Sequence, residues 1–188
     1  MGMLILASGS PRRKELLEMV GRPYQCEPSE ADETVPEGME PQDIPEFLAV
    51  KKAKAVLAKH PEDMVLGADT IVELDGQVLG KPGTKEEAAQ MLRMLSGETH
   101  MVYTGVAILS AGQEAHFTTV TKVEFYPLSE EEIQEYIATG EPMDKAGAYG
   151  IQGKGALLVK RIHGDFYTVM GLPIGEVERH LRRLEQQD

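Results

Sequence analysis

A pair of long strand-like segments, residues 99–110 and 114–126 joined by a tight turn, places the strongest constraint on the fold of this chain. One face of the second segment shows the two-residue spacing of a half-buried strand. The residues on that face are Phe117, Thr119, Thr121, Val123 and Phe125. Segments with helical features precede and follow this hairpin. A long hairpin between helices favours an α/β or α+β protein with a mixed, strongly twisted sheet over a purely parallel one.

The other elements are predicted from apolar spacing and from residues that start or stop helices. Strands are expected over residues 3–7, 23–28, 64–74, 77–79 and 156–162. Helices are expected from Ser10-Pro11 to Gly21, from Gln42 to about Lys59, from Thr84 to about Leu95, from Ser129 to about Thr139 and over residues 174–185. Thr84 with Glu87 and Ser129 with Glu132 have the spacing of capping boxes. Residues 29–41 and 144–155 are expected to be loops. The length of 188 residues suits one domain, residues 1–188, or one domain with two lobes around a cleft.

The charge balance restricts the class of partner. The chain has 31 acidic and 19 basic residues and a formal net charge of −12. An acidic surface repels nucleic acid, and aromatic residues for base stacking make up only 5% of the chain. The basic residues are nevertheless clustered, at Arg12–Lys14, at Lys51–Lys54 and at Lys81 with Lys85. Such clusters suit a small polyanion with a metal ion, although for any one cluster taken alone a solvated helix face is the favoured interpretation.

The compartment is expected to be the cytoplasm. A single cysteine, Cys26, allows no internal disulfide and fits a reducing environment, and its expected role is structural. No apolar run reaches the length of a membrane span, and the apolar start lacks the basic region of a signal peptide. The five histidines show no ligand spacing, so a zinc site is not expected.

The segment from Ala7 to Arg13 joins an expected strand to the start of an expected helix. Such a junction offers free backbone N–H groups and the positive end of a helix dipole to an anion. Ser8 and Ser10 add hydroxyl groups, and Arg12 and Arg13 add planar donors suited to phosphate. The alternative is a capped surface helix with two solvated arginines, and the spacing alone favours neither interpretation.

Asp69 interrupts an otherwise apolar strand in Gly67–Val72. A carboxylate in such a strand is costly unless it is paired or binds a metal, so a metal ligand or general base is favoured over a residue that caps a neighbouring helix. Glu30, Asp32 and Glu33 of the acidic loop are candidates to join Asp69 around Mg²⁺, although each taken alone is by default a solubilising surface residue.

Two further segments carry weaker signals. Lys81, in the loop Gly80–Pro82, is able to reach a phosphate, although most loop lysines are merely solvated. In Asp144–Gly153, closely spaced glycines allow the backbone to approach a ligand, and the Gln152 amide is suited to pairing with a base edge. An ordinary flexible turn is the alternative.

The blocks Leu4–Arg13, Gly67–Val72, Gly80–Pro82 and Asp144–Gly153, followed by Gly171-Leu172-Pro173, together resemble the Maf family. They occur in family order and span nearly the whole chain. The resemblance implies an ITPase-like α/β fold with two lobes flanking a central cleft, often as a homodimer. It also implies a pyrophosphatase that hydrolyses a nucleoside triphosphate with a divalent metal cation, Mg²⁺ or Mn²⁺.

The resemblance also implies roles for individual residues. Asp69 is the expected proton acceptor or metal-bound base, and Asp69 with Glu33 is the expected metal site. The residues expected to hold the phosphates are Ser8, Arg13, Lys52 and Lys81. The residues expected to read the base are Arg12, Thr70 and Gln152. These match the branch of the family that acts on dTTP and UTP in nucleotide-pool housekeeping.

Two other functions compete with this one. A nucleotide-binding regulator of septum formation with little turnover would use the same pocket. A nucleic-acid-binding module is disfavoured by the charge and the low aromatic content, and neither nucleic acid nor a membrane is expected as a partner.

Overall fold

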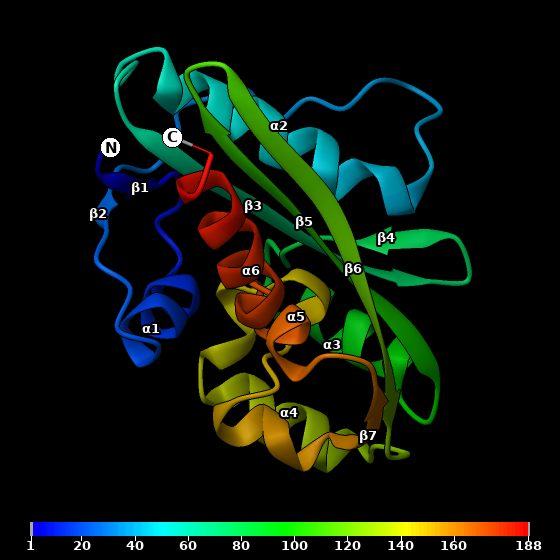
Figure 1. Ribbon diagram of the computed structural model, residues 1–188. Helices are drawn as coiled ribbons and strands as arrows, with labels where there is room; N and C mark the ends of the chain where they lie inside the picture. Colours follow the sequence, from blue (N-terminus) through cyan, green and yellow to red (C-terminus); the bar gives the residue numbers. More distant parts are fainter. Residues whose placement is uncertain (1, 188) are drawn as a thin grey trace. The chain divides into compact units, whose positions relative to one another are not determined.

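The predicted hairpin is formed by strands β5 (Thr99–Ser110) and β6 (Gln113–Phe125) in the computed structural model, which describes residues 2–187 (Figure 1). The turn between them contains Gly112, whose backbone φ of 80° lies in the left-handed region that a glycine adopts without steric cost. A tight turn of this kind sets the pairing of the two long strands.

The sheet is mixed, as predicted. Its strand order is β2-β1-β3-β5-β6-β7, and β4 pairs with β3. The remaining strands are β1 (Leu4–Leu6), β2 (Gln25–Cys26), β3 (Met64–Leu74), β4 (Gln77–Leu79) and β7 (Val159–His163). Strand β1 is parallel to β2 and to β3, with Ile5 opposite Gln25 and Val65. Strand β4 is antiparallel to β3, and β7 is antiparallel to β6.

The helices flank this sheet. They are α1 (Pro11–Met19), α2 (Ile44–Leu57), α3 (Lys85–Leu95), α4 (Glu130–Ala138), α5 (Phe166–Met170) and α6 (Ile174–Glu185). Short 3₁₀ turns cover Pro41–Asp43, Glu141–Asp144, Ala146–Ala148 and Gly153–Leu157. The predicted α/β fold with a mixed sheet and flanking helices is therefore confirmed.

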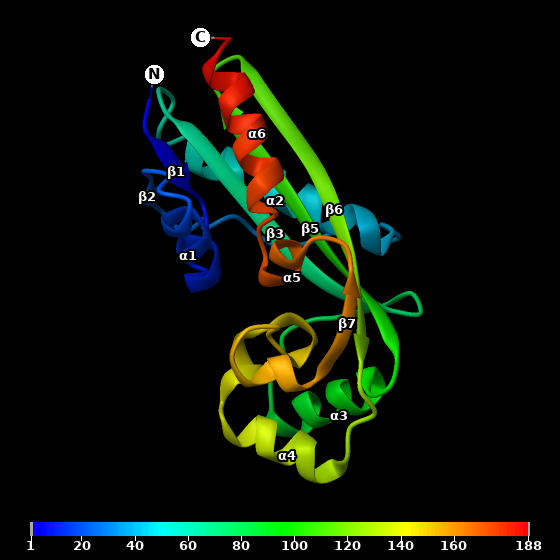
Figure 2. The ribbon, with the colours of Figure 1, turned by 60° about the horizontal axis from the view of Figure 1, so that its bottom comes forward.

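The described residues form two compact units. The first comprises residues 2–69, 104–119 and 171–187. In this unit α2 covers one face of the strands and α6 the other (Figures 1 and 2). The core under α2 includes Ala49 and Ala53 of the helix with Ile5 and Val65 of the strands, and Leu181 of α6 is fully buried. Burial of apolar surface on both faces explains why β1 and the start of β3 are continuous apolar runs.

The second unit comprises residues 70–103 and 120–170. Its core is formed by α3, α4 and the strand residues beneath them, including Leu92 of α3, Ile133 of α4 and Phe125 of β6. Ser129 and Glu132 form the predicted capping box at the start of α4. The apolar core and the capping box hold α4 in place, and the Gly-rich segment, residues 144–155, follows this helix in the chain.

Two local predictions are corrected by the structure, and one short helix was missed. The strand expected over residues 156–162 begins only at Val159, because the preceding residues form a 3₁₀ turn whose backbone N–H groups bind a side chain described below. Helix α5 was not predicted. At the start of α3, Thr84 accepts from the N–H of Glu87 as expected, but the Glu87 carboxylate accepts from Gly83 N instead of from the cap residue.

Candidate active site

The junction between β1 and α1 is organised by two serines. Ser10 is the N-cap of α1, and its Oγ accepts from the N–H of Arg13 at 3.5 Å. The Ser8 Oγ accepts from the N–H of Ser10 at 3.2 Å. The Cys26 thiol, on the neighbouring strand β2, donates to the Ser8 carbonyl at 3.1 Å. These bonds fix the backbone of the predicted anion-binding segment.

The Arg13 side chain is anchored within this junction. Its Nη1 donates to Ser8 Oγ at 3.0 Å, and its Nε donates to the Gly171 carbonyl at 2.7 Å. Burial lowers the pKa of Arg13 to about 10, although the negative charges of Asp69 and Glu33 act in the opposite direction. Arg13 therefore remains a cation at neutral pH. The contact also gives the Gly171-Leu172-Pro173 segment a role, because its first carbonyl orients Arg13.

Lys52 joins the two predicted metal-binding carboxylates. Its Nζ lies 2.8 Å from Asp69 Oδ1 and 2.7 Å from Glu33 Oε1. The side chains of Lys52 and Asp69 are only 14% and 15% exposed, whereas that of Glu33 is 63% exposed. Glu33, which lies in the irregular segment before α2, thus contacts the ion pair that Lys52 of α2 forms with Asp69 of β3.

A glycine on β3 allows this meeting. A Cβ atom at Gly67 would lie 2.5 Å from the Ala49 carbonyl and 3.0 Å from the Ala53 Cβ, both on α2. Only a glycine there lets α2 lie so close to β3. Because Lys52 stands between Ala49 and Ala53 on that helix, the close approach brings its ammonium to Asp69.

The donors fit a hard divalent cation. Among the described residues, no three His, Cys, Asp or Glu side chains are grouped so that they could hold a metal ion by themselves. Asp69 and Glu33 nevertheless converge on one ammonium group, so two carboxylates are available at one place. Mg²⁺ typically binds through one or two carboxylates and completes its shell with water and substrate phosphates.

The other predicted site residues belong to the second unit. Lys81 is exposed, and Thr70 and Gln152 are half-buried. The N–H of Gly147 donates to the Gly80 carbonyl at 3.1 Å, which connects the Lys81 loop to the Gly-rich segment. Lys81 and Gln152 therefore lie on two segments that a backbone hydrogen bond joins.

The sequence-predicted residues thus fall into two groups. The first unit brings together Ser8 and Arg13, and joins Lys52 to Asp69 and Glu33. The charge of Arg12 acts on Arg13, so Arg12 lies near this group. The second unit carries Thr70, Lys81 and Gln152. Sequence reasoning missed Tyr136 and Glu141 of the second unit, which bind the backbone around Gln152.

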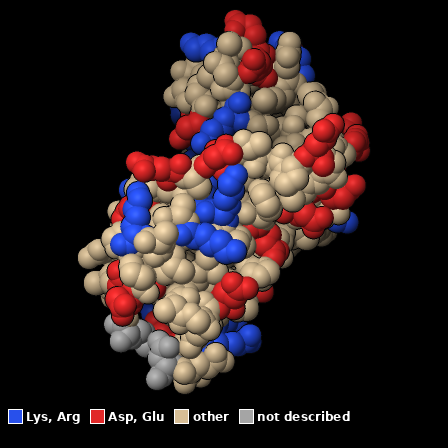
Figure 3. All heavy atoms as spheres, turned by 90° about the horizontal axis from the view of Figure 1, so that it is seen from above, with Lys and Arg blue, Asp and Glu red and all other residues tan. Residues whose placement is uncertain are grey.

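The surface charge is not uniform. Figure 3 shows acidic and basic side chains interspersed on one face of the molecule. The net charge of −12 is therefore compatible with local cationic groups such as Arg13 and Lys52.

A family model and several named proteins match nearly the whole length of this chain. The family model described as "Maf-like protein" matches residues 3–184. A protein of Geobacillus sp. (strain WCH70) named dTTP/UTP pyrophosphatase is 55% identical, covering 98% of this chain and 99% of its own. A protein of the same name from Bacillus cytotoxicus is 54% identical, covering 98% of this chain and 97% of its own. Among solved structures, the Staphylococcus aureus Ham1 protein matches 65% of this chain and 71% of its own, with 14% identity and a TM-score of 0.49.

Proposed function

Because the chain belongs to the Maf family, we propose that it is a nucleoside triphosphate pyrophosphatase that converts dTTP and UTP to the monophosphate and pyrophosphate. The observation that carries the proposal is a sequence identity of 54–55%, over 98% of this chain, to proteins named for this activity. The side chains fit the chemistry. Hydrolysis of a polyanion needs cations for the phosphates and a carboxylate for the attacking water, and the first unit gathers both.

In the proposed reaction, the oxygen of a water molecule attacks the α-phosphorus. The bond from that phosphorus to the oxygen that bridges to the β-phosphorus breaks, and pyrophosphate leaves. Asp69 accepts the proton of the water, and Ser8, Arg13, Lys52 and Lys81 hold the phosphates. Substrate phosphate would compete with Asp69 for the Lys52 ammonium, which releases the carboxylate to act as a base.

Asp69 and Glu33 would hold the divalent cation, Mg²⁺ or Mn²⁺, which would neutralise phosphate charge. Arg12, Thr70 and Gln152 would read the base. The proposed location is the cytoplasm, and a homodimer is part of the same proposal. Among the residues that the structure describes, no helix has the length and apolar character needed to cross a membrane.

Exchange of Asp69 for asparagine tests the proposal. We expect Asp69→Asn to lower multiple-turnover pyrophosphate release from dTTP and UTP by about 100-fold or more, since a positioned base contributes about that much. Nucleotide binding should persist, and the exposed control Asp43→Asn should remain active. Near wild-type turnover in Asp69→Asn would refute the assignment of the base. If the wild type turned over no triphosphate but bound nucleotides tightly, the regulator of septum formation would replace the enzyme.

A further inference from the structure

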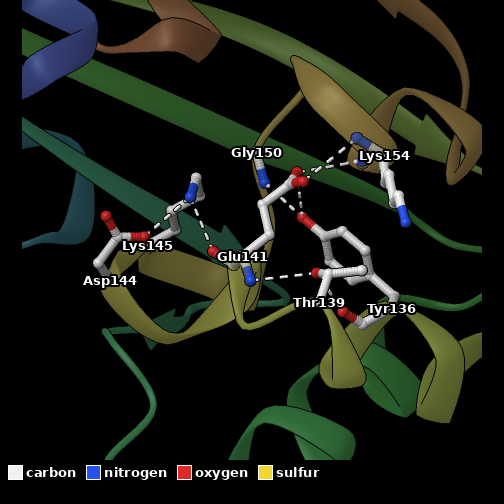
Figure 4. Close-up of polar contacts among 8 residues, drawn as sticks. Tyr136, Thr139, Glu141, Asp144, Lys145, Gly150 and Lys154 are labelled. Atoms are coloured by element: carbon white, nitrogen blue, oxygen red, sulfur yellow. Dashed lines mark hydrogen bonds and ion pairs between the residues drawn. The ribbon is translucent and has the colours of Figure 1, made fainter.

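A single carboxylate organises the Gly-rich segment of the second unit (Figure 4). Glu141 follows α4, and its Oε1 accepts from the Tyr136 hydroxyl at 2.9 Å and from the N–H of Gly155 at 3.2 Å. Its Oε2 accepts from the N–H of Lys154 at 3.2 Å. Bonds from neutral donors to a carboxylate are among the stronger hydrogen bonds of a protein.

Tyr136 extends this network to the other end of the segment. Its hydroxyl accepts from the N–H of Gly150 at 3.0 Å while it donates to Glu141. Tyr136 is only 4% exposed, and Gly150 is also buried. Residues 150–155 are therefore fixed at their first residue by Tyr136 and at their last two residues by Glu141. Gln152 lies between these anchors.

The glycines of this segment are explained by the same carboxylate. Gly153 has a φ of 63°, and a Cβ there would lie 2.8 Å from Glu141 Oε2. A Cβ at Gly155 would lie 1.7 Å from the Gly150 carbonyl oxygen. From sequence the glycines were interpreted as allowing the backbone to approach a ligand. In the structure, Gly153 lets the segment pass close to Glu141, and Gly155 lets it pack against the backbone of Gly150.

The position of Glu141 itself is also held. The Lys145 Nζ donates to the Glu141 carbonyl at 2.7 Å and to Asp144 Oδ1 at 2.8 Å (Figure 4). The Glu141 N–H donates to Thr139 Oγ1 at 3.1 Å. Both the backbone and the side chain of Glu141 are thus constrained, as a residue that orients a recognition loop requires.

We infer that Glu141, together with Tyr136, is a positioning residue for base selection, because it holds the segment that presents Gln152. This inference rests on the proposed function, in which Gln152 reads the pyrimidine. A side-chain amide discriminates between bases only when its donor and acceptor are held in a fixed orientation. Loosening residues 150–155 therefore reduces selectivity while it leaves the groups that act on the phosphates in place.

A double-mutant cycle tests this inference. The variants are Glu141→Gln, Gln152→Ala, their combination, and Glu135→Gln as an exposed control on α4. The measured quantity is the ratio of kcat/KM for UTP to kcat/KM for ATP. We expect Gln152→Ala and Glu141→Gln each to lower this ratio about tenfold, mainly through KM for UTP. The combination should lower it no further than Gln152→Ala alone, because both changes act through one side chain. Glu135→Gln should leave the ratio unchanged.

Two outcomes would overturn the inference while the proposed function stands. One is a Glu141→Gln variant that loses activity equally on UTP and ATP, which would indicate a general structural role. The other is a multiplicative effect in the combined variant, which would show that the two residues act independently. No effect of Gln152→Ala would overturn the inference together with the assignment of Gln152 to base reading. Tyr136→Phe provides the same test with the loss of a single hydroxyl, should Glu141→Gln fail to fold. Absence of triphosphate turnover in the wild type would instead refute the proposed function.

Discussion

Lys52 forms ion pairs within the fold and also has a proposed role in binding phosphate. Its ammonium lies between Asp69 and Glu33, and it is largely shielded from water. Two carboxylates that share one cation repel each other when that cation is removed. The lysine therefore stabilises a pair of charges that the proposed reaction also needs, one as base and both as metal ligands.

Replacement of Lys52 by glutamine tests this balance. We expect Lys52→Gln to lower the free energy of unfolding by about 2 kcal/mol, the typical loss for a hydrogen bond to a charged group. Turnover of dTTP should fall by at least tenfold, because a phosphate-binding charge is lost as well. Urea denaturation and pyrophosphate release measure the two effects. Lys54 is exposed on the same helix, and Lys54→Gln should change neither the stability nor the turnover. Wild-type stability and turnover in Lys52→Gln would contradict the assignment of Lys52 to phosphate binding.

His100 is a second residue whose environment has a measurable effect, in this case on the pH dependence of stability. It is 1% exposed in β5, its Nε2 bonds to the Tyr149 hydroxyl at 2.6 Å, and its ring packs edge to face against Phe125. Burial lowers the pKa of His100 from 6.5 to about 4. In the folded protein the ring is therefore neutral at pH values where the unfolded chain is already protonated.

The pH dependence of stability follows from this difference. Because the unfolded chain binds a proton near pH 6.5 and the folded chain only near pH 4, the stability is complete above pH 6.5 and decreases as the pH falls toward 4. The loss over that window is about 3 kcal/mol. We expect His100→Gln to flatten the change in unfolding free energy measured in urea between pH 7 and pH 4.5. His163 is exposed, and His163→Gln should keep the wild-type dependence of unfolding free energy on pH. The same wild-type dependence in His100→Gln would contradict the burial of the His100 ring.

At the scale of elements, the position of α2 depends on glycines in the strands beneath it. Besides the contact at Gly67, a Cβ at Gly105 on β5 would lie 2.1 Å from the backbone nitrogen of Glu46, near the start of α2. Both glycines let the helix backbone approach the sheet more closely than any other residue would allow. The helix carries Lys52, so this packing reaches the candidate active site.

A methyl group at Gly67 should therefore affect both stability and activity. We expect Gly67→Ala to destabilise the fold by about 1–3 kcal/mol through overpacking, and to reduce turnover because a displaced α2 moves Lys52 away from Asp69. Thermal unfolding and pyrophosphate release provide the measurements. Gly175→Ala in α6 is the matched control, since no atom lies within 4 Å of its added Cβ and alanine favours a helix. Equal behaviour of the two variants would contradict the close approach of α2.

At the scale of the whole molecule, local signals predicted most elements and distant contacts decided the rest. The caps at Ser10 and Ser129 were predictable because each partner lies three residues away. Helix α5 has only 5 residues, too few to show a helical period. The late start of β7 depends on Glu141, whose partners are backbone N–H groups 13 and 14 residues further along, and such groups carry no side-chain signal.

The candidate site divides in the same way. The anion-binding junction and the unusual Asp69 were visible from residue types in their local context. The assignment of Lys52 and Glu33 came from the family resemblance, because only the fold brings residues 33, 52 and 69 to one place. Neither local residue types nor the family resemblance indicated Tyr136 and Glu141, since a tyrosine on a helix and a glutamate before a proline are common in sequences.

The net charge leads to a prediction about the kind of anion that the molecule binds. With a charge of −12, the surface repels a long polyanion even where single cations such as Lys81 are exposed to it. A short polyanion needs only the few cations of one site. We expect inorganic pyrophosphate to inhibit dTTP turnover competitively at 0.1 M salt, whereas a 20-nucleotide oligothymidylate, which presents the same base as dTTP, should neither inhibit turnover nor bind in a fluorescence-anisotropy titration. Oligothymidylate binding that weakens steeply with added salt would reveal a cationic surface and would contradict the exclusion of nucleic acid as a partner.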